Sequence, residues 1–454
     1  MTNPRVATPD RAARPAPAAP RSLALPRFER HALANGLRIE HAERCGLPEV
    51  SLHLVLECGA GAEPPRLGGL GELTARLLTA GTPGRDAMEM ARWLDRLGVG
   101  YRATAGYAVG AVSMHFLSEV FDEALEFLAA TILDPGFPEH EVERIRRERI
   151  DEIERQADDP ATVAGLATIA ELYGDGLYGR PVAGAGATVS EIGPEAVRDF
   201  HDTRYRPRGA LLIACGDLDR ERLLSAVEAR FGAWSGEAAP VSPPETPEPR
   251  AKGLILIDRP GSAQSEIRVA TVGVPHNTAD HHAIIVANAI LGGLFNSRIN
   301  LNLREDKGWT YGARSSFRFR RGAGPFIART AVETARTGPA FEEVLREIEA
   351  MRTAPVTADE MTLARNALTL SLPLQFETAA QICGKVSRQR VFGLPDDYWE
   401  TYRSRIEAVT PEAVQEVCRT YLDPDRLTLL AVGDAATAEP TLDGLGPVDV
   451  RSAS

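Results

Sequence analysis

The sequence predicts an α+β fold made of two homologous repeats, each an antiparallel-rich sheet with helices packed on one face. Three observations lead to this prediction. A proline-rich segment divides the chain, two motifs recur at nearly one spacing, and the same order of strand and helix patterns appears on either side. With 454 residues the chain is too long for one ordinary hydrophobic core, so at least two domains are expected.

The dividing segment, residues 236–252, contains the run Ala-Pro-Val-Ser-Pro-Pro-Glu-Thr-Pro-Glu-Pro. Proline lacks an amide donor, so this run cannot sustain a helix or a central strand and is expected to form a semi-rigid linker. It separates a first repeat, 27–235, from a second repeat, 253–440. Residues 1–26, rich in Pro, Ala and Arg, are expected to form a disordered leader, and residues 441–454 a tail.

The two repeats share motifs at almost one offset. Gly216 follows an apolar strand pattern at 210–214, and Gly433 follows a similar pattern at 427–431, 217 residues later. Glu141 and Glu360 lie near the starts of charged helices and are 219 residues apart. Two independent motifs that recur at nearly the same separation indicate a duplicated domain with small insertions.

Each repeat also has one order of elements. A strand comes first, then an amphipathic helix, then a segment of two strands, then a further helix. In the first repeat we expect these at 50–57, 71–80, 101–117 and 120–132; in the second, at 265–272, 283–291, 312–332 and 340–351. Since strands and helices do not alternate strictly, a doubly wound parallel sheet is not favoured.

Composition excludes some classes of function. The formal charge of −12 and the mixed placement of charges argue against nucleic-acid binding. No stretch reaches the roughly 18 continuous apolar residues of a membrane span, so no membrane insertion is expected. The five cysteines are odd in number and form no CxxC pair, which suits reduced thiols in the cytoplasm, with the periplasm as the alternative location.

Two blocks carry a resemblance to a known family. One spans residues 69–82; the other runs from Leu291-Gly292-Gly293 to Lys307-Gly308-Trp309-Thr310-Tyr311-Gly312. Together with the duplication, they resemble the insulinase, pitrilysin and mitochondrial-processing-peptidase family over about residues 27–440. The resemblance implies that the two repeats form half of a clamshell that closes around a chamber.

Active members of that family carry an inverted zinc motif, H-x-x-E-H, on the first helix, with a second Glu further on. The resemblance places Glu72 and Arg76 at the two His positions, Ala75 at the general base, and Glu152 at the distal ligand. Arginine cannot be deprotonated to bind a metal, and a methyl group cannot take a proton from water. We therefore expect no metal at these positions and no cofactor in this chain.

The side chain of Arg76 leaves two interpretations open. Residues four apart on a helix face each other, so Arg76 could replace the zinc as the cation between Glu72 and Glu152. Alternatively, Glu72 and Arg76 form a solvated surface pair that contributes little to stability.

The second block retains a functional pair. Family members use an Arg and a Tyr, seven residues apart, to grip substrate and to support the tetrahedral oxyanion, and by motif position these are Arg304 and Tyr311. A surface Arg and a core Tyr are the alternative interpretation.

The pattern predicts a non-catalytic, zinc-free subunit of a heterodimeric zinc metallopeptidase. Its partner would be a zinc-bearing chain of the same family with an intact H-x-x-E-H, and its ligand a peptide substrate. The short Gly292-Gly293 before Arg298 favours a bacterial pair over a mitochondrial one. A proteolytically inactive scaffold or peptide-binding protein is the alternative, while Ala75 and Arg76 argue against an active peptidase. The negative net charge favours basic peptides.

Overall fold

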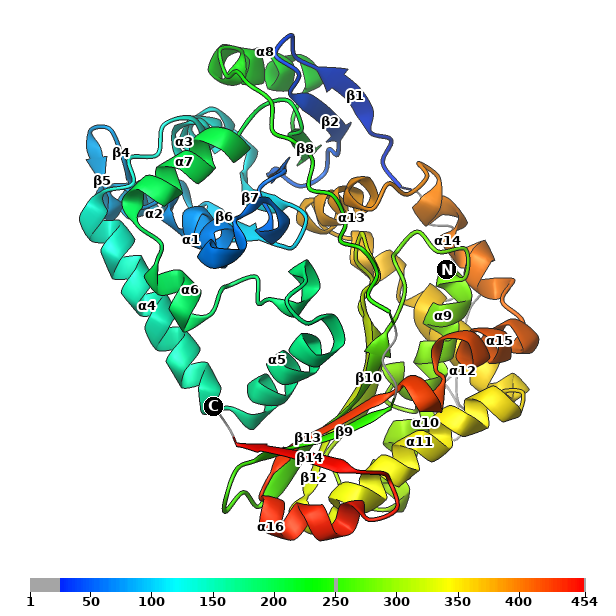
Figure 1. Ribbon diagram of the computed structural model, residues 1–454. Coiled ribbons are helices and arrows are strands. Elements are labelled where there is room, and N and C mark those ends of the chain that lie inside the picture. Colours follow the sequence, from blue (N-terminus) through cyan, green and yellow to red (C-terminus); the bar gives the residue numbers. More distant parts are fainter. Residues whose placement is uncertain (1–24, 249–251, 453–454) are drawn as a thin grey trace, which may run out of the picture.

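The computed structural model describes residues 25–248 and 252–452, in which two six-stranded sheets are each accompanied by helices (Figure 1). Most of the predicted leader lies outside the described residues, as do residues 249–251 of the predicted linker. From its first described residues, the chain builds the first sheet and its helices, then crosses to the second sheet. The α+β class and the two-domain organisation are confirmed.

The first sheet has the order β1-β2-β8-β3-β7-β6. Its strands are β1 (Glu29–Ala32), β2 (Arg38–Glu43), β3 (Glu49–Leu56), β6 (Gly100–Ala105), β7 (Gly110–Leu117) and β8 (Leu211–Gly216). Only the β2–β8 pair is parallel. A short hairpin, β4 (Gly81–Thr82) and β5 (Arg85–Asp86), stands apart from it.

The second sheet repeats this order as β14-β9-β13-β10-β12-β11. Its strands are β9 (Gly253–Asp258), β10 (Gln264–Val272), β11 (Ala313–Phe317), β12 (Pro325–Glu333), β13 (Thr428–Gly433) and β14 (Val448–Ser452). β14 runs parallel to β9 and forms one edge of the sheet, so the predicted tail supplies a strand. This strand has five largely exposed residues, too few to give a clear pattern in the sequence.

The helices divide between the two repeats. The first contains α1 (Leu70–Leu77), α2 (Ala87–Leu97), α3 (Phe121–Leu133), α4 (Glu139–Ala157), α5 (Pro160–Tyr173), α6 (Gly186–Ser190), α7 (Pro194–Arg204) and α8 (Arg220–Phe231). The second contains α9 (His281–Asn288), α10 (Arg298–Asn300), α11 (Thr337–Thr353), α12 (Ala358–Leu370), α13 (Ala379–Val391), α14 (Tyr398–Glu407), α15 (Pro411–Tyr421) and α16 (Ala435–Ala438).

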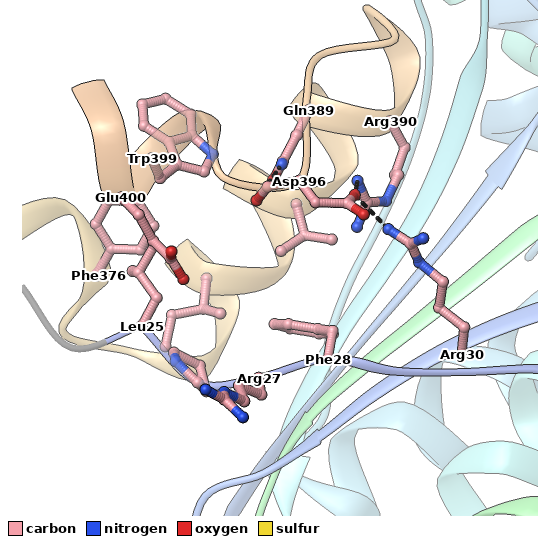
Figure 2. Close-up of a pocket in the computed structure, with 13 residues that line it drawn as sticks. Leu25, Arg27, Phe28, Arg30, Phe376, Gln389, Arg390, Asp396, Trp399 and Glu400 are labelled. Atoms are coloured by element: carbon pink, nitrogen blue, oxygen red, sulfur yellow. Dashed lines mark hydrogen bonds and ion pairs between the residues drawn. The ribbon is translucent and has the colours of Figure 1, made fainter. Parts of the chain in front are cut away.

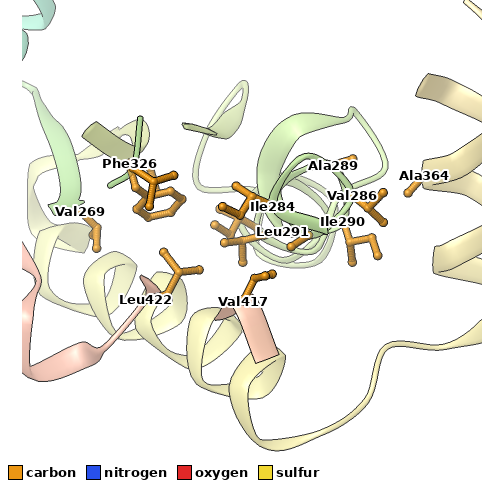
Figure 3. Close-up of a cluster of buried hydrophobic side chains, with 14 of the residues drawn as sticks. Val269, Ile284, Val286, Ala289, Ile290, Leu291, Phe326, Ala364, Val417 and Leu422 are labelled. Atoms are coloured by element: carbon orange, nitrogen blue, oxygen red, sulfur yellow. The ribbon is translucent and has the colours of Figure 1, made fainter. Parts of the chain in front are cut away.

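Each sheet packs one face on helices of its own repeat. In β3 the alternate residues Val50, Leu52 and Leu54 enter the first core, as the period of two in a strand requires. The core of the second repeat lies between its sheet and its own helices, and Figure 3 shows part of it around Ile284 and Leu291. Burial of these side chains contributes about 1.5–3 kcal/mol each and holds the layers together.

The opposite face of each sheet receives a helix from the other repeat. Helix α5 packs on β10 and β13 of the second sheet, and α13 packs on β3 and β8 of the first (Figure 1). Ala164 of α5 is fully buried against Ile255 and Leu430. The exchange joins the two repeats into one packed body.

One segment, His281–Asp306, is long and apolar enough to cross a membrane by length and composition alone. It contains α9, α10 and two π-helical turns, at Ala289–Gly293 and Leu301–Asp306. Of its most apolar stretch, 56% is buried inside the protein. Such burial is typical of a core helix.

Candidate functional site

Helix α1 carries Glu72, Ala75 and Arg76, the positions at which the resemblance predicts a degenerate zinc motif, and its start is held by a buried carboxylate. Glu63 accepts hydrogen bonds from the backbone amides of Gly69, at 3.3 Å, and Gly71, at 2.8 Å. Gly69 has a φ of 99°, a left-handed conformation that favours glycine. Burial raises the pKa of Glu63 to about 7, although both amide hydrogen bonds oppose that rise. Sequence reasoning did not single out Glu63.

Leu73 and Leu77 turn one side of α1 into the first core, while Glu72 and Arg76 lie on the opposite, partly exposed side. Ala75, at the position of the general base, is buried and offers only a methyl group. This face of α1 meets α4, which carries Glu152.

The structure brings Arg76 against both predicted carboxylates. Its Nη1 lies 3.2 and 3.1 Å from the two oxygens of Glu152, and its Nε lies 3.4 Å from Oε1 of Glu72. The other oxygen of Glu72 accepts the backbone N–H of Ala105 at the end of β6, at 2.9 Å. The guanidinium therefore links α1 to α4, and Glu72 links α1 to the sheet.

A second arginine completes this group, which we call the Arg76 cluster: Glu72, Arg76, Arg149 and Glu152. The buried Arg149 donates to Oε2 of Glu152 at 2.9 Å and to the carbonyl of Ala183 at 3.0 Å. The sequence offered one signal for Arg149, since it stands three residues before Glu152 on a helix.

The charges in the cluster stabilise one another. Hydrogen bonds from Arg76, and then from Arg149, lower the pKa of Glu152, while partial burial opposes them. Burial alone would lower the pKa of Arg76, but the hydrogen bonds and charges of Glu152 and Glu72 raise it. Both groups thus stay ionised near neutral pH.

The cluster does not fit a zinc ion. Of the family's ligand positions, Glu152 supplies a carboxylate that already binds two guanidinium groups, and Arg76 supplies a cation. In residues 25–248 and 252–452, no group of three or more His, Cys, Asp or Glu side chains is arranged to hold a metal.

Arg304 and Tyr311 lie in the second repeat, on the π-helical turn 301–306 and just before β11. The guanidinium of Arg304 sits 4.5 Å from the ring centre of Phe295, and its Nε is 3.3 Å from Glu305. Tyr311 is 94% exposed, so the alternative of a core tyrosine is excluded. Within the described parts of the chain, no hydrogen bond or ion pair joins this pair to the Arg76 cluster.

A hollow of the surface lies elsewhere and has a volume of about 470 Å³. Figure 2 shows it between the segment 25–30 and helices α13 and α14. Arg390 crosses this junction and binds Glu40 of β2, at 2.6 and 3.0 Å, as well as Asp396. The pocket marks a junction between the repeats, because its lining comes from the start of the first repeat and from helices of the second. None of the predicted site residues lines it.

Comparisons with known proteins place the chain in a family. Residues 42–186 match the family model "Insulinase (Peptidase family M16)", and residues 191–368 match "Peptidase M16 inactive domain". The chain belongs to the insulinase family of M16 peptidases.

Relatives and solved structures agree with this assignment. An uncharacterized zinc protease of Mycobacterium tuberculosis (strain H37Rv) is 26% identical over 90% of this chain and 93% of its own length. The mitochondrial-processing peptidase subunit beta of Bos taurus is 24% identical over 88% and 83%. A peptidase M16 inactive domain from Pseudomonas fluorescens superposes with a TM-score of 0.83 and 25% identity over 90% of this chain and 98% of that one.

A protease of Helicobacter pylori, at 15% identity, shares the fold alone, with a TM-score of 0.81 over 90% of this chain and 100% of that chain. The match to the inactive domain, together with the Arg76 cluster, identifies a non-catalytic M16-like protein.

Proposed function

We propose that this chain is the zinc-free subunit of a heterodimeric metallopeptidase. A partner of the same family with an intact H-x-x-E-H supplies the zinc and the general base. Arg304 and Tyr311 of this chain bind the peptide and stabilise the tetrahedral oxyanion. The alternative is a proteolytically inactive scaffold or peptide-binding protein of the same fold.

The observation that carries the proposal is the combination of two features in one chain. An arginine with two carboxylate partners fills the place of the metal site, and a Tyr hydroxyl and a guanidinium remain accessible on the other repeat. A stand-alone peptidase needs the first site, whereas a scaffold has no need of the second. A subunit that completes a divided active site accounts for both.

The chemistry of the pair suits that role. The Tyr311 hydroxyl is a hydrogen-bond donor exposed to solvent, and Arg304 carries a fixed positive charge. Negative charge develops on the carbonyl oxygen as a peptide bond is attacked, so donors aimed at that oxygen stabilise the transition state more than the substrate.

The test mixes the purified chain with a zinc-bearing chain encoded beside it and measures hydrolysis of fluorogenic peptides. We expect Tyr311→Phe or Arg304→Ala to lower kcat of the mixture about 10²–10³-fold, the usual loss of an oxyanion donor, with little change in complex formation. Arg403→Ala, which removes the ion-pair partner of Glu407 on α14, is the control. Unchanged turnover in both site variants would refute the catalytic-support role, and binding without hydrolysis in every mixture would favour the scaffold.

A further inference from the structure

The second sheet carries arginines on three neighbouring strands in direct register. Arg314 of β11 pairs with Arg329 of β12, which pairs in turn with Arg268 of β10. Residues that pair directly across strands point to the same face, and like charges placed opposite each other are destabilising. The fold therefore gathers positive charge on one side of this sheet at a cost in stability.

Arg318 adds a fourth arginine to this face of the sheet. It follows β11 directly, its N–H binds the carbonyl of Pro325 at 2.8 Å, and it lies four residues from Arg314, on the same face. Partial desolvation by its neighbours lowers the pKa of Arg318, and the charges of Arg329, Arg320 and Arg268, which lie close by, lower it further.

Only part of this charge is neutralised. The buried Arg268 binds Glu266 at 2.8 Å and the carbonyl of Ala161 at 2.9 Å. Arg314, Arg318 and Arg329, which we call the arginine row, are exposed, and none has a carboxylate partner among the residues the structure describes.

Helix α5 covers part of the same face. Ala270 and Ile327, which pair with each other and share the face of the arginine row, pack against Leu172 and Tyr173 of α5. The helix covers β10 and β13, and the row on β11 and β12 stays exposed. Because β11 begins two residues after Tyr311, the row starts beside the proposed substrate-binding loop.

We propose that the arginine row binds acidic side chains of an extended peptide, so that the substrates of this subunit are acidic peptide segments. This inference rests on the proposed function and names its substrate class. Arg314 and Arg318 are about 13 Å apart along the strand, so the row matches Asp or Glu at positions i and i+4 of an extended peptide. Each guanidinium can bind one carboxylate with two parallel hydrogen bonds.

The positive charge of the arginine row thus favours acidic peptides, whereas the net negative charge of the chain favours basic ones. A net charge of −12 favours basic peptides and repels a nucleic acid at long range, but contact with the row favours carboxylates. Arginine also binds phosphate groups, so the experiment includes an oligonucleotide as a competing ligand.

The experiment measures fluorescence anisotropy of labelled ten-residue peptides with the purified full-length chain at low salt. One peptide carries Glu at i and i+4 in a Ser/Thr background, and matched peptides carry Gln or Lys there. We expect the Glu peptide to bind at least tenfold more tightly than the Gln peptide, with a preference that shrinks as salt is raised. Arg314→Gln/Arg318→Gln should remove that preference.

The control is Arg66→Gln/Arg92→Gln, which removes two exposed arginines of the first repeat, and thermal melts verify that each variant folds. Equal binding of Glu and Gln peptides, tighter binding of the Lys peptide, tighter binding of a ten-nucleotide single strand, or an unchanged preference in the double variant would overturn the proposal. Because no partner or hydrolysis is needed, a mixture that fails to cleave would count against the proposed function and leave this result unaffected.

Discussion

The side chain of Arg76 occupies the centre of the Arg76 cluster, with carboxylates from two helices around it. Its predicted neighbours were correct because i,i+4 spacing on α1 and the family spacing to Glu152 are both visible in the sequence. Arg149 and Glu63 were not anticipated, because their partners, the carbonyl of Ala183 and the amides of Gly69 and Gly71, come together only in the fold.

Removing the charge of Arg76 tests whether the cluster is more than a solvated pair. We expect Arg76→Met, which keeps most of the apolar stem, to lower the free energy of unfolding by about 1–3 kcal/mol, because Glu72 and Glu152 each lose a charged partner. Urea denaturation at pH 7 measures this change.

Arg144→Met is the matched control, since Arg144 binds Glu141 and Glu148 on the exposed side of α4. That substitution should cost less than about 1 kcal/mol. Equal losses in the two variants would show that Arg76 is an ordinary surface residue.

A cluster of histidines in the second repeat should make stability depend on pH. His276 stacks on His281 with ring centres 4.3 Å apart, and both rings are buried. Burial lowers the pKa of His276 to about 4 and of His281 to about 3, helped by the neighbouring charge of Arg388. Burial and the charge of Arg405 lower the pKa of His282 to about 4. Tyr398 and Tyr402 also face these rings.

With these shifts the unfolded chain binds more protons than the folded chain below about pH 6.5. The contribution of these histidines to stability should therefore be constant above that pH and fall as the pH drops toward 4. His276→Phe keeps the stacking on Phe392, so its Tm should fall less than that of the parent between pH 7.5 and 5. Parallel melting curves with equal losses of Tm would contradict this account.

At the scale of elements, the two repeats exchange helices α5 and α13 across their sheets. The sequence predicted the order of strands and helices that the two repeats share, because those periodic patterns are strong and the duplication places them twice. It did not predict the exchange, since an apolar helix face does not reveal which sheet it covers. The arginine row was equally hidden, because it depends on the register of β11 against β12, which places Arg314 opposite Arg329.

The packing of α5 has a direct test at Ala164, which is fully buried against Ile255, Ile257 and Leu430. Ala164→Leu should lower the free energy of unfolding by about 1–3 kcal/mol, because the contact has no room for a larger side chain. Leu166→Ala removes a 46% exposed side chain from the same helix and should change stability far less. Urea denaturation measures the free energy of unfolding of both variants. An unchanged value for Ala164→Leu would show that α5 packs loosely on the sheet.

At the scale of the whole molecule, the repeats form one body, with Arg76 between two carboxylates in the first and an accessible Arg304 and Tyr311 in the second. Ion pairs between Glu40 and Arg390, and between Glu57 and Arg321, cross the junction in addition to the exchanged helices. In the proposed heterodimer, this body would present Arg304 and Tyr311 as a fixed surface to the partner.

The most direct measurement determines bound zinc and peptide hydrolysis together, for the chain alone and for its complex with a chain that carries H-x-x-E-H. We expect the chain alone to bind no stoichiometric zinc and to cleave no peptide, whereas the complex holds one zinc per pair and cleaves. One equivalent of zinc and peptide cleavage by the chain alone would contradict this expectation.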